Sequence, residues 1–172
     1  TCHFISAMNI TERIVRLAAP YTAVAFDVFD TLIKRDVAKP TDLFQLGGQA
    51  FAKARMQAEA EAREQKQGEV TLAEIYAQPC LVGYDPAREC ALELAAAVPN
   101  HPVLEAVRAL HAQGKHIYYI SDMYLPPEQI GAMLARCGYE MLDGGFVSCS
   151  YGMQKRSGAL FRHFLRETEL KA

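Results

Sequence analysis

Hydrophobic and polar residues alternate along this chain in blocks that predict short strands separated by helices. Apolar residues recur at helical spacing over residues 8–19 until Pro20 interrupts them, which predicts an amphipathic helix. An apolar run follows at residues 24–32, and further β-prone runs lie at 116–120 and 145–148. We expect these three runs to provide the core strands.

Helix-favouring residues fill most of the chain between these runs. Ala, Glu, Arg and Gln dominate the stretch from Leu43 to Gln67, and Gly47 and Gly48 are expected to bend or interrupt this long helix. Further helices are expected at residues 71–77, 85–97, 101–113 and 127–137.

Strands that alternate with helices are typical of a parallel sheet covered on both faces. The predicted fold class is therefore α/β, with a three-layer, doubly wound (Rossmann-like) parallel sheet as its core. Residues 1–36 and 99–172 are assigned to this core. Residues 37–98 form a helical insertion after the first core strand.

Length and composition agree with a folded core of this kind. The chain has 172 residues, 51% of them hydrophobic and 22% charged, which is enough apolar material to bury a core. A net charge of −2 without a basic stripe gives no electrostatic reason to expect nucleic acid as a partner. No apolar run approaches the roughly 18 residues that span a bilayer, so we expect no membrane insertion and a cytoplasmic protein.

Polar residues capable of chemistry follow each predicted strand. Asp27 and Asp30 interrupt the first apolar run, Ser121 and Asp122 end the second, and Lys155 follows the third. In parallel α/β sheets, ligands bind beyond the carboxyl ends of the strands, where a carboxylate can act as nucleophile or metal ligand. The alternative for each residue is structural, because Asp suits turns, Ser suits helix N-caps and Lys is usually a solvated surface residue.

The order of these residues resembles the motifs of the haloacid dehalogenase-like (HAD) superfamily, from about Val24 to the end of the chain. In that superfamily an Asp attacks a phosphoryl or similar electrophilic centre, and a hydroxyl, a Lys and usually Mg²⁺ offset the charge that develops. The resemblance implies that Asp27 is the nucleophile, Ser121 the hydroxyl donor and Lys155 the cation.

The same resemblance implies further contacts. Mg²⁺ is expected between the Asp27 carboxylate and the main-chain carbonyl of Phe29. Thr31 matches the Thr of the first motif, and we expect Thr31 and Asp122, the neighbour of Ser121, to contact a small anionic substrate.

One departure from the superfamily's pattern concerns the proton donor. Where its phosphatases carry a second Asp as general acid and base, this chain has Phe29, which cannot transfer a proton. Asp30 comes one position later, and neighbouring strand residues point to opposite faces, so Asp30 is not taken as a substitute. Haloacid dehalogenases also carry an aromatic residue here, so Phe29 favours dehalogenase-like chemistry or no turnover.

Another departure concerns the fourth motif, a Gly-Asp or Asp-Asp pair that follows a further strand and completes the metal site. The apolar pattern of residues 160–165 predicts the helix after Lys155, and the sequence ends at Ala172 where the next strand is due. We therefore expect a fragment truncated before the fourth core strand, with other domains of a longer chain as partners.

In this superfamily the helical insertion, residues 37–98, would be a cap that covers the strand ends, excludes water and contacts substrate. Arg55 and Arg63 lie two turns apart on one face of the predicted helix, and we expect them to bind the anionic part of the substrate. The alternative, favoured for any single residue, is a solvated helix face with i, i+4 pairs such as Arg55 with Glu59.

Residues 26–33 and 119–126 resemble HAD-type domains found beside glycosyltransferases in bacterial surface-polysaccharide proteins. That resemblance implies a sugar-phosphate setting. The function expected first is a HAD-like hydrolase that acts through an aspartyl nucleophile on a small phosphorylated substrate. The alternatives are dehalogenase-like activity and a non-catalytic binding or scaffolding domain of a larger polysaccharide-biosynthesis protein.

Overall fold

The computed structural model describes residues 8–170, so the chain end on which the expected truncation depends, residues 171–172, lies outside the described residues. Within residues 8–170, no helix is long and apolar enough to cross a membrane. In chain order the elements are α1 (Ile10–Ala18), β1 (Ala23–Phe26), β2 (Ile33–Arg35), α2 (Asp42–Gln45), α3 (Gln49–Lys66), α4 (Leu72–Tyr76), a 3₁₀-helix (Pro79–Leu81), α5 (Pro86–Ala96), β3 (Ala97–Pro99), α6 (His101–Ala112), β4 (His116–Ser121), α7 (Pro127–Arg136), β5 (Gly144–Val147), α8 (Ser148–Tyr151) and α9 (Ala159–Glu167).

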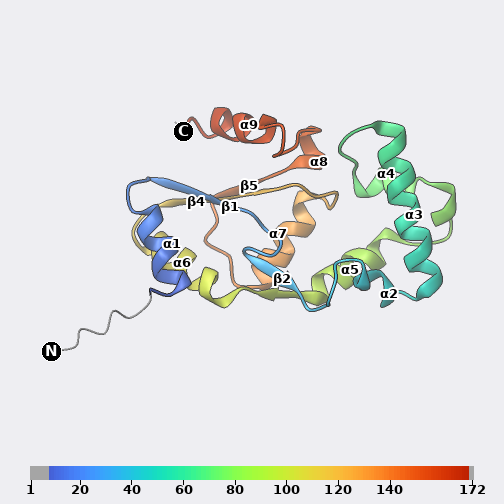
Figure 1. Ribbon diagram of the computed structural model, residues 1–172, viewed down its shortest axis with the longest axis horizontal. Helices are drawn as coiled ribbons and strands as arrows, with labels where there is room; N and C mark the ends of the chain where they lie inside the picture. Colours follow the sequence, from blue (N-terminus) through green and yellow to red (C-terminus); the bar gives the residue numbers. More distant parts are fainter. Residues whose placement is uncertain (1–7, 171–172) are drawn as a thin grey trace.

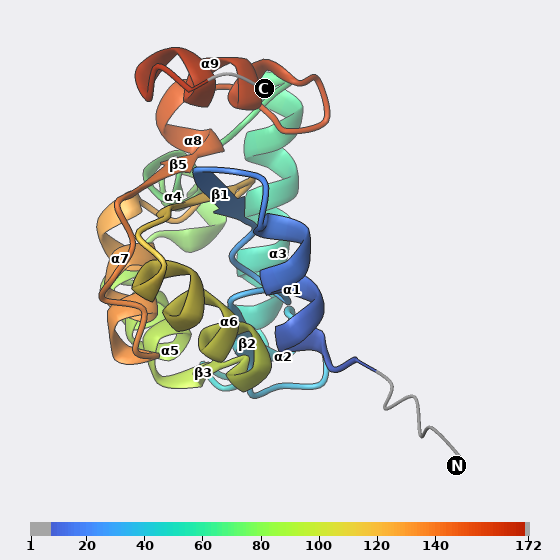
Figure 2. The same cartoon turned by 90° about the vertical axis from the view of Figure 1, so that its left-hand side faces the viewer.

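A parallel sheet of three strands, in the order β1-β4-β5, forms the centre of the molecule. Figures 1 and 2 show helices on both faces of this sheet: α9 covers one face, and α1, α6 and α7 cover the other. The prediction of a mixed α/β fold with a parallel sheet between helices is confirmed. Because the strands are parallel, their carboxyl ends share one edge of the sheet.

Side-chain alternation along β4 explains how the sheet is buried on both faces. Tyr119 points into the main core, whereas Tyr118 packs under α9 with its ring centroid 5.3 Å from that of Phe164. Gly145 of β5 lies beside Tyr119 in the register, and a Cβ atom there would fall 1.8 Å from the Tyr119 ring. The weak strand signal around Gly145 therefore has a packing cause, because only glycine leaves room for this ring.

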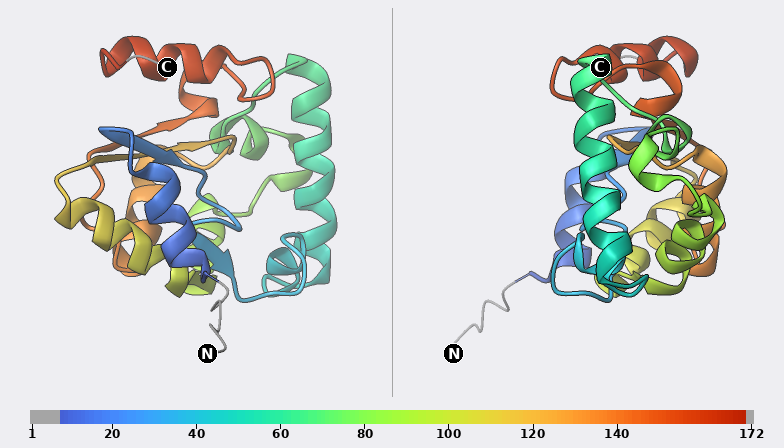
Figure 3. Two further views of the ribbon diagram at one scale, coloured as in Figure 1. Left: turned by 60° about the vertical axis from the view of Figure 1, so that its left-hand side comes forward. Right: turned by 90° about the vertical axis from the view of Figure 1, so that its right-hand side faces the viewer.

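The segment between β2 and β3, which we call the helical segment (residues 36–96), leaves and re-enters the core through an antiparallel ribbon of these two strands. Helix was expected as far as residue 97, but α5 ends at Ala96 and the chain continues as a strand. Figures 1 and 3 show α3 and α4 beyond the carboxyl edge of the sheet, on the side where β5 leads into α8.

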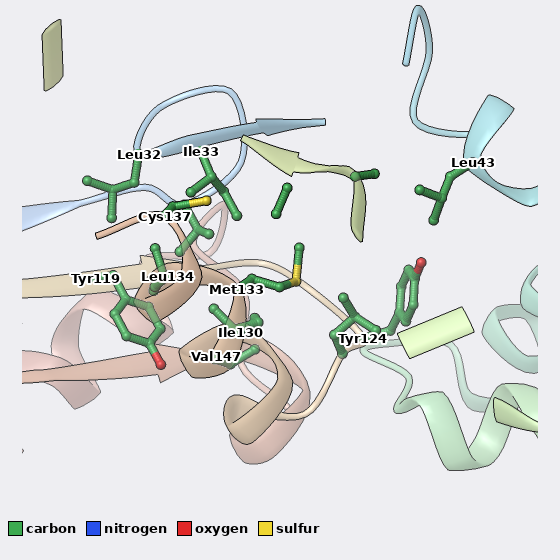
Figure 4. Packing of buried hydrophobic residues seen from close by; sticks show 14 of the residues in the cluster. Leu32, Ile33, Leu43, Tyr119, Tyr124, Ile130, Met133, Leu134, Cys137 and Val147 are labelled. Carbon is green, nitrogen blue, oxygen red and sulfur yellow. The ribbon is translucent and has the colours of Figure 1, made fainter. Parts of the chain in front are cut away.

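The main hydrophobic core runs without interruption from the sheet into the helical segment. Figure 4 shows Tyr119 at the sheet end of this cluster, Met133 of α7 in the middle, and Leu43 and Tyr124 toward the helical segment. A backbone hydrogen bond reinforces the junction, because the Leu72 N–H donates to the Tyr124 carbonyl oxygen at 2.9 Å. The helical segment is thus packed onto the carboxyl edge of the sheet.

Candidate functional site

An ion pair between Asp27 and Lys155 lies at the carboxyl edge of the sheet. Asp27 directly follows β1, and Lys155 lies in the loop between α8 and α9. The Lys155 Nζ donates to Asp27 Oδ1 at 2.7 Å, and the Val28 N–H donates to the same oxygen at 2.9 Å. The Asp27 side chain remains 46% exposed, so this carboxylate is oriented by two donors and still open to a ligand.

Asp122 holds the loop that carries Lys155. Its two carboxylate oxygens accept the backbone N–H of Lys155 at 2.9 and 3.2 Å. Asp122 follows the last residue of β4, so the sheet edge itself fixes where the Lys155 backbone lies. Asp122 was expected to contact substrate, and the contact that the structure gives it is with this loop.

Ser121 is the last residue of β4 and is 1% exposed. Phe26 of β1 pairs with Tyr119 of β4, so Asp27 and Ser121 both follow this pair at the shared edge. In the described part of the chain, no side-chain hydrogen bond joins Ser121 to Asp27 or Lys155. The sheet brings the predicted triad to one edge, and the direct contact in it is the one between Asp27 and Lys155.

Hydrogen bonds to backbone groups stabilise the turn after Asp27. Asp30 adopts a left-handed conformation with φ of 59°, which suits Asp better than most residues. The Thr31 carbonyl accepts a hydrogen bond from Asn100 Nδ2 at 2.8 Å, and the Thr31 N–H lies 3.4 Å from the Val28 carbonyl oxygen. The contacts found for Thr31, expected to lie beside the substrate, are those of a turn residue.

Phe29 occupies the position where a HAD-like phosphatase would carry its proton donor, and packing holds its ring in place. The guanidinium carbon of Arg35 lies 4.0 Å from the centroid of the Phe29 ring. Arg35 in turn donates from Nε and Nη2 to the two carboxylate oxygens of Glu93 in α5, at 2.8 and 3.0 Å. Phe29 therefore anchors the sheet edge to the helical segment and supplies no acid.

This edge offers few protein ligands for Mg²⁺. Mg²⁺ commonly binds through one or two carboxylates together with waters and substrate oxygens. Asp27 Oδ1 already accepts the Lys155 ammonium, which leaves Oδ2 and the expected main-chain carbonyl of Phe29 as donors from the protein. Across residues 8–170 no group of three or more His, Cys, Asp or Glu side chains could hold a metal.

Two of the hollows near this edge are lined by predicted site residues. The larger, of about 450 Å³, lies between the helical segment and the chain after β4, and its wall includes Arg63 and Asp122. The smaller, of about 190 Å³, is lined by Asp27, Lys155 and the exposed ring of Phe161. Asp27 does not line the larger hollow. Asp122 lines it and binds the backbone of Lys155, whose side chain lines the smaller one.

Carboxylates outnumber guanidiniums in the wall of the larger hollow. Arg63, which was predicted to bind substrate, lines it, and Arg63 Nη2 lies 2.7 Å from Glu59 Oε1. An anionic ligand would compete with Glu59 for Arg63, whose side chain is 42% exposed. The charged residues of this wall are Arg35, Glu59, Arg63, Glu69, Glu93 and Asp122.

Arg55 does not face a hollow, which corrects the prediction that it binds substrate. Its side chain is fully buried and donates to both carboxylate oxygens of Glu89, at 2.6 and 3.0 Å. The Arg55 guanidinium also lies over the rings of Phe44 and Tyr124. Burial alone would lower the pKa of Arg55, but the bond to Glu89 and nearby charges outweigh it and raise the pKa above its usual value. Arg55 is a structural cation inside the helical segment.

Glu69 is a candidate that the sequence did not reveal, because its hydrogen-bond partners are remote in sequence. Glu69, between α3 and α4, is 8% exposed, and its carboxylate accepts hydrogen bonds from Ser148 Oγ and Gln154 Nε2. These partners are 79 and 85 residues away, a separation that leaves no local pattern in the sequence. Glu69 therefore connects the helical segment to the residue that precedes Lys155.

Other reactive groups near this edge are not poised to ionise. Burial raises the pKa of the Cys149 thiol, and burial together with the charge of Glu89 raises the pKa of the Tyr124 phenol well above its usual value. A neutral thiol is a poor nucleophile and a neutral phenol a poor base. Asp27 and Lys155 therefore remain the candidate reactive groups at this edge.

Comparison with known proteins adds no family to these observations. A scan against protein-family models and a search of curated proteins each give no match to this chain. The HAD-like interpretation stays a prediction, carried by the order of the motif residues and by the geometry at the sheet edge.

Proposed function

We propose that this chain is a HAD-like hydrolase whose Asp27 attacks a small phosphorylated substrate. The observation that carries the proposal is the 2.7 Å contact between Lys155 Nζ and Asp27 Oδ1 at the carboxyl edge of a parallel sheet. Residues 128 positions apart in the sequence meet there. This edge is where α/β proteins bind their ligands.

In the proposed reaction, an Asp27 carboxylate oxygen forms a bond to phosphorus as the bond to the leaving oxygen breaks. Lys155 offsets the negative charge on the phosphoryl oxygens, and the role proposed for the Ser121 hydroxyl, at the end of β4, is to donate a hydrogen bond to one of them. A Mg²⁺ ion held by Asp27 and the Phe29 carbonyl would add positive charge there. Water then hydrolyses the aspartyl phosphate and restores Asp27.

The helical segment is proposed to act as a cap over this site. Its position beyond the carboxyl edge and the hollow of about 450 Å³ beneath it support that role. The hollow is large enough for the sugar or other organic part of a small substrate. Arg63 is the exposed guanidinium in its wall, and it is the residue of the cap proposed to contact an anionic group.

Phe29 restricts which substrates turn over. A leaving alkoxide needs a proton, and general acid catalysis typically contributes about 10²–10⁴-fold to such a step. A leaving group that is stable as an anion does not need that proton. We therefore infer slow hydrolysis of sugar phosphates and other alkyl esters, and faster hydrolysis of activated phosphate esters.

A non-catalytic binding domain is the second candidate, and the packing of Phe29 is what favours it. Phe29, Arg35 and Glu93 form a fixed contact between the sheet and the helical segment, and this contact supplies stability instead of a proton donor. In this alternative Lys155 and Arg63 bind an anionic ligand that is never cleaved.

Phosphate release measured on two esters separates these candidates. With Mg²⁺ present, we expect release from p-nitrophenyl phosphate and much slower release from glycerol phosphate. Asp27→Asn should abolish the release, whereas Asp30→Asn, a change in the exposed neighbouring acid, should preserve it. Binding of either ester without any release from p-nitrophenyl phosphate would favour the binding domain and contradict the hydrolase.

A further inference from the structure

Glu69 lies at the point where the helical segment touches the loop that carries Lys155. The Ser148 hydroxyl donates to Glu69 Oε2, and Gln154 Nε2 donates to Glu69 Oε1 at 2.8 Å. Both carboxylate oxygens are therefore used, and the residue is 8% exposed. Burying a carboxylate costs free energy that its hydrogen bonds must offset. The two donors to Glu69 therefore show which parts of the chain it holds.

Those donors continue into the sheet edge. Ser148, the first residue of α8, is fully buried, and its Oγ accepts the Met123 N–H at 2.9 Å while its own hydrogen goes to Glu69. Met123 follows Asp122, whose carboxylate accepts the Lys155 N–H. The network thus reaches the loop on both sides of the bond between Gln154 and Lys155.

We propose that Glu69 is a positioning residue, through which the helical segment sets the placement of the Lys155 ammonium against Asp27. Glu69 fixes Gln154, Asp122 fixes the Lys155 backbone, and the Lys155 side chain then spans the remaining distance to Asp27. The catalytic meaning of this placement rests on the proposed function, whereas the placement itself does not.

Glu69 links the wall of the larger hollow to the loop that carries Lys155. Glu69 also lines the larger hollow, so the carboxylate that holds the Lys155 loop is part of the wall of the proposed substrate site. The helical segment therefore covers the site and also completes it, because without Glu69 the loop keeps its Asp122 anchor and loses the one at Gln154.

Trace labelling of lysines with acetic anhydride, read by peptide mass spectrometry, tests this proposal without any need for turnover. An ammonium held in an ion pair reacts slowly, so we expect Glu69→Gln to raise the labelling rate of Lys155 several-fold. Gln154→Ala removes one of the two bonds and leaves the buried Ser148 contact intact, so it should raise the rate in the same direction with little effect on folding.

Glu74→Gln is the matched control. Glu74 caps α4 and pairs with Lys66 at 2.6 Å, so this change should raise the labelling of Lys66 and lower stability while Lys155 stays as in the wild type. The proposal would be overturned if neither Glu69→Gln nor Gln154→Ala changed the labelling rate of Lys155. It would also be overturned if Glu74→Gln raised that rate equally. A chain that shows the Lys155 effect and no hydrolysis would retain the positioning role and reject the hydrolase.

Discussion

Under the proposed function, the single residue Phe29 limits which substrates the site can turn over. A side chain at this position of a HAD-like phosphatase would protonate the leaving group, and here it is a ring stacked against Arg35, which is itself paired with Glu93. The same position therefore contributes packing between two parts of the chain in place of proton transfer.

We predict that Phe29→Asp raises the hydrolysis of glycerol phosphate by about 10²-fold, the lower end of the contribution of general acid catalysis. The gain is held down because Arg35, 4.0 Å from the present ring, would favour the ionised form of the new carboxyl group. Steady-state phosphate release is the measurement. Phe29→Leu should give no gain, and an equal gain in both variants would show that the ring acts only by its bulk.

Arg55 and Arg63 form a natural comparison on one helix. We predict that Arg55→Met lowers the free energy of unfolding by about 3–5 kcal/mol, because it leaves the buried carboxylate of Glu89 without its cationic partner. Arg63→Met should change it by less than about 0.5 kcal/mol, because the pair with Glu59 is exposed. Urea unfolding measures both, and similar losses in the two variants would contradict the assignment of Arg55 to the interior.

The sequence was enough to predict that Asp27 and Lys155 lie at the same edge of the sheet, because each follows a strand that a local apolar run indicates. It could not supply the burial of Arg55, since its partner Glu89 lies 34 residues away and the pattern around Arg55 alone is that of a solvated helix face. Glu69 was missed for the same physical reason, because a buried hydrogen bond between remote residues has no periodic signature.

Among elements, the long periodic helices and the core strands were predictable, whereas the ribbon of β2 and β3 was not. Each of its strands has three residues, and Ala97–Pro99 continues a run of small residues that favours helix until pairing with Ile33–Arg35 outweighs that preference. The helix expected after Lys155 is α9, which begins at Ala159, and the loop before it is held by Asp122 and Glu69.

Asp143 ties the starts of β4 and β5 together. Its Oδ2 accepts the Ile117 N–H at 2.6 Å, and its Oδ1 lies 3.2 Å from His116 Nδ1. Burial alone would raise the pKa of Asp143, but these two bonds outweigh it and hold the pKa below its usual value. A lowered folded-state pKa gives stability that is present above the unfolded pKa of about 4 and lost as pH falls through the folded value.

Asp143→Asn should therefore lower the free energy of unfolding by about 1 kcal/mol near pH 7, a modest value because the side chain is partly solvated. The difference from wild type should shrink as pH falls below about 4. Asp85→Asn is the control, because Asn caps the N-terminus of α5 as well as Asp does. A deficit in Asp143→Asn that stays constant down to low pH would contradict the ionised role of Asp143.

At the scale of the whole molecule, one hydrophobic cluster joins the sheet to the helical segment, with Tyr124 beside the junction. We predict a single cooperative unfolding transition on heating, because separating the two parts would expose this cluster and the Arg55 network together. Far-ultraviolet circular dichroism and tyrosine absorbance should give the same midpoint. Two separate midpoints would show that the helical segment unfolds as an independent domain.

The claim that Asp27 is a nucleophile is tested most directly by trapping its phosphorylated form. Acetyl phosphate is a suitable donor because its leaving group needs no proton, which removes the limitation set by Phe29. After incubation with Mg²⁺, reduction with borohydride and peptide mass spectrometry, we predict modification at Asp27, lost in Asp27→Asn and retained in Asp30→Asn. Modification absent from Asp27, or equal at Asp27 and Asp30, would contradict the account.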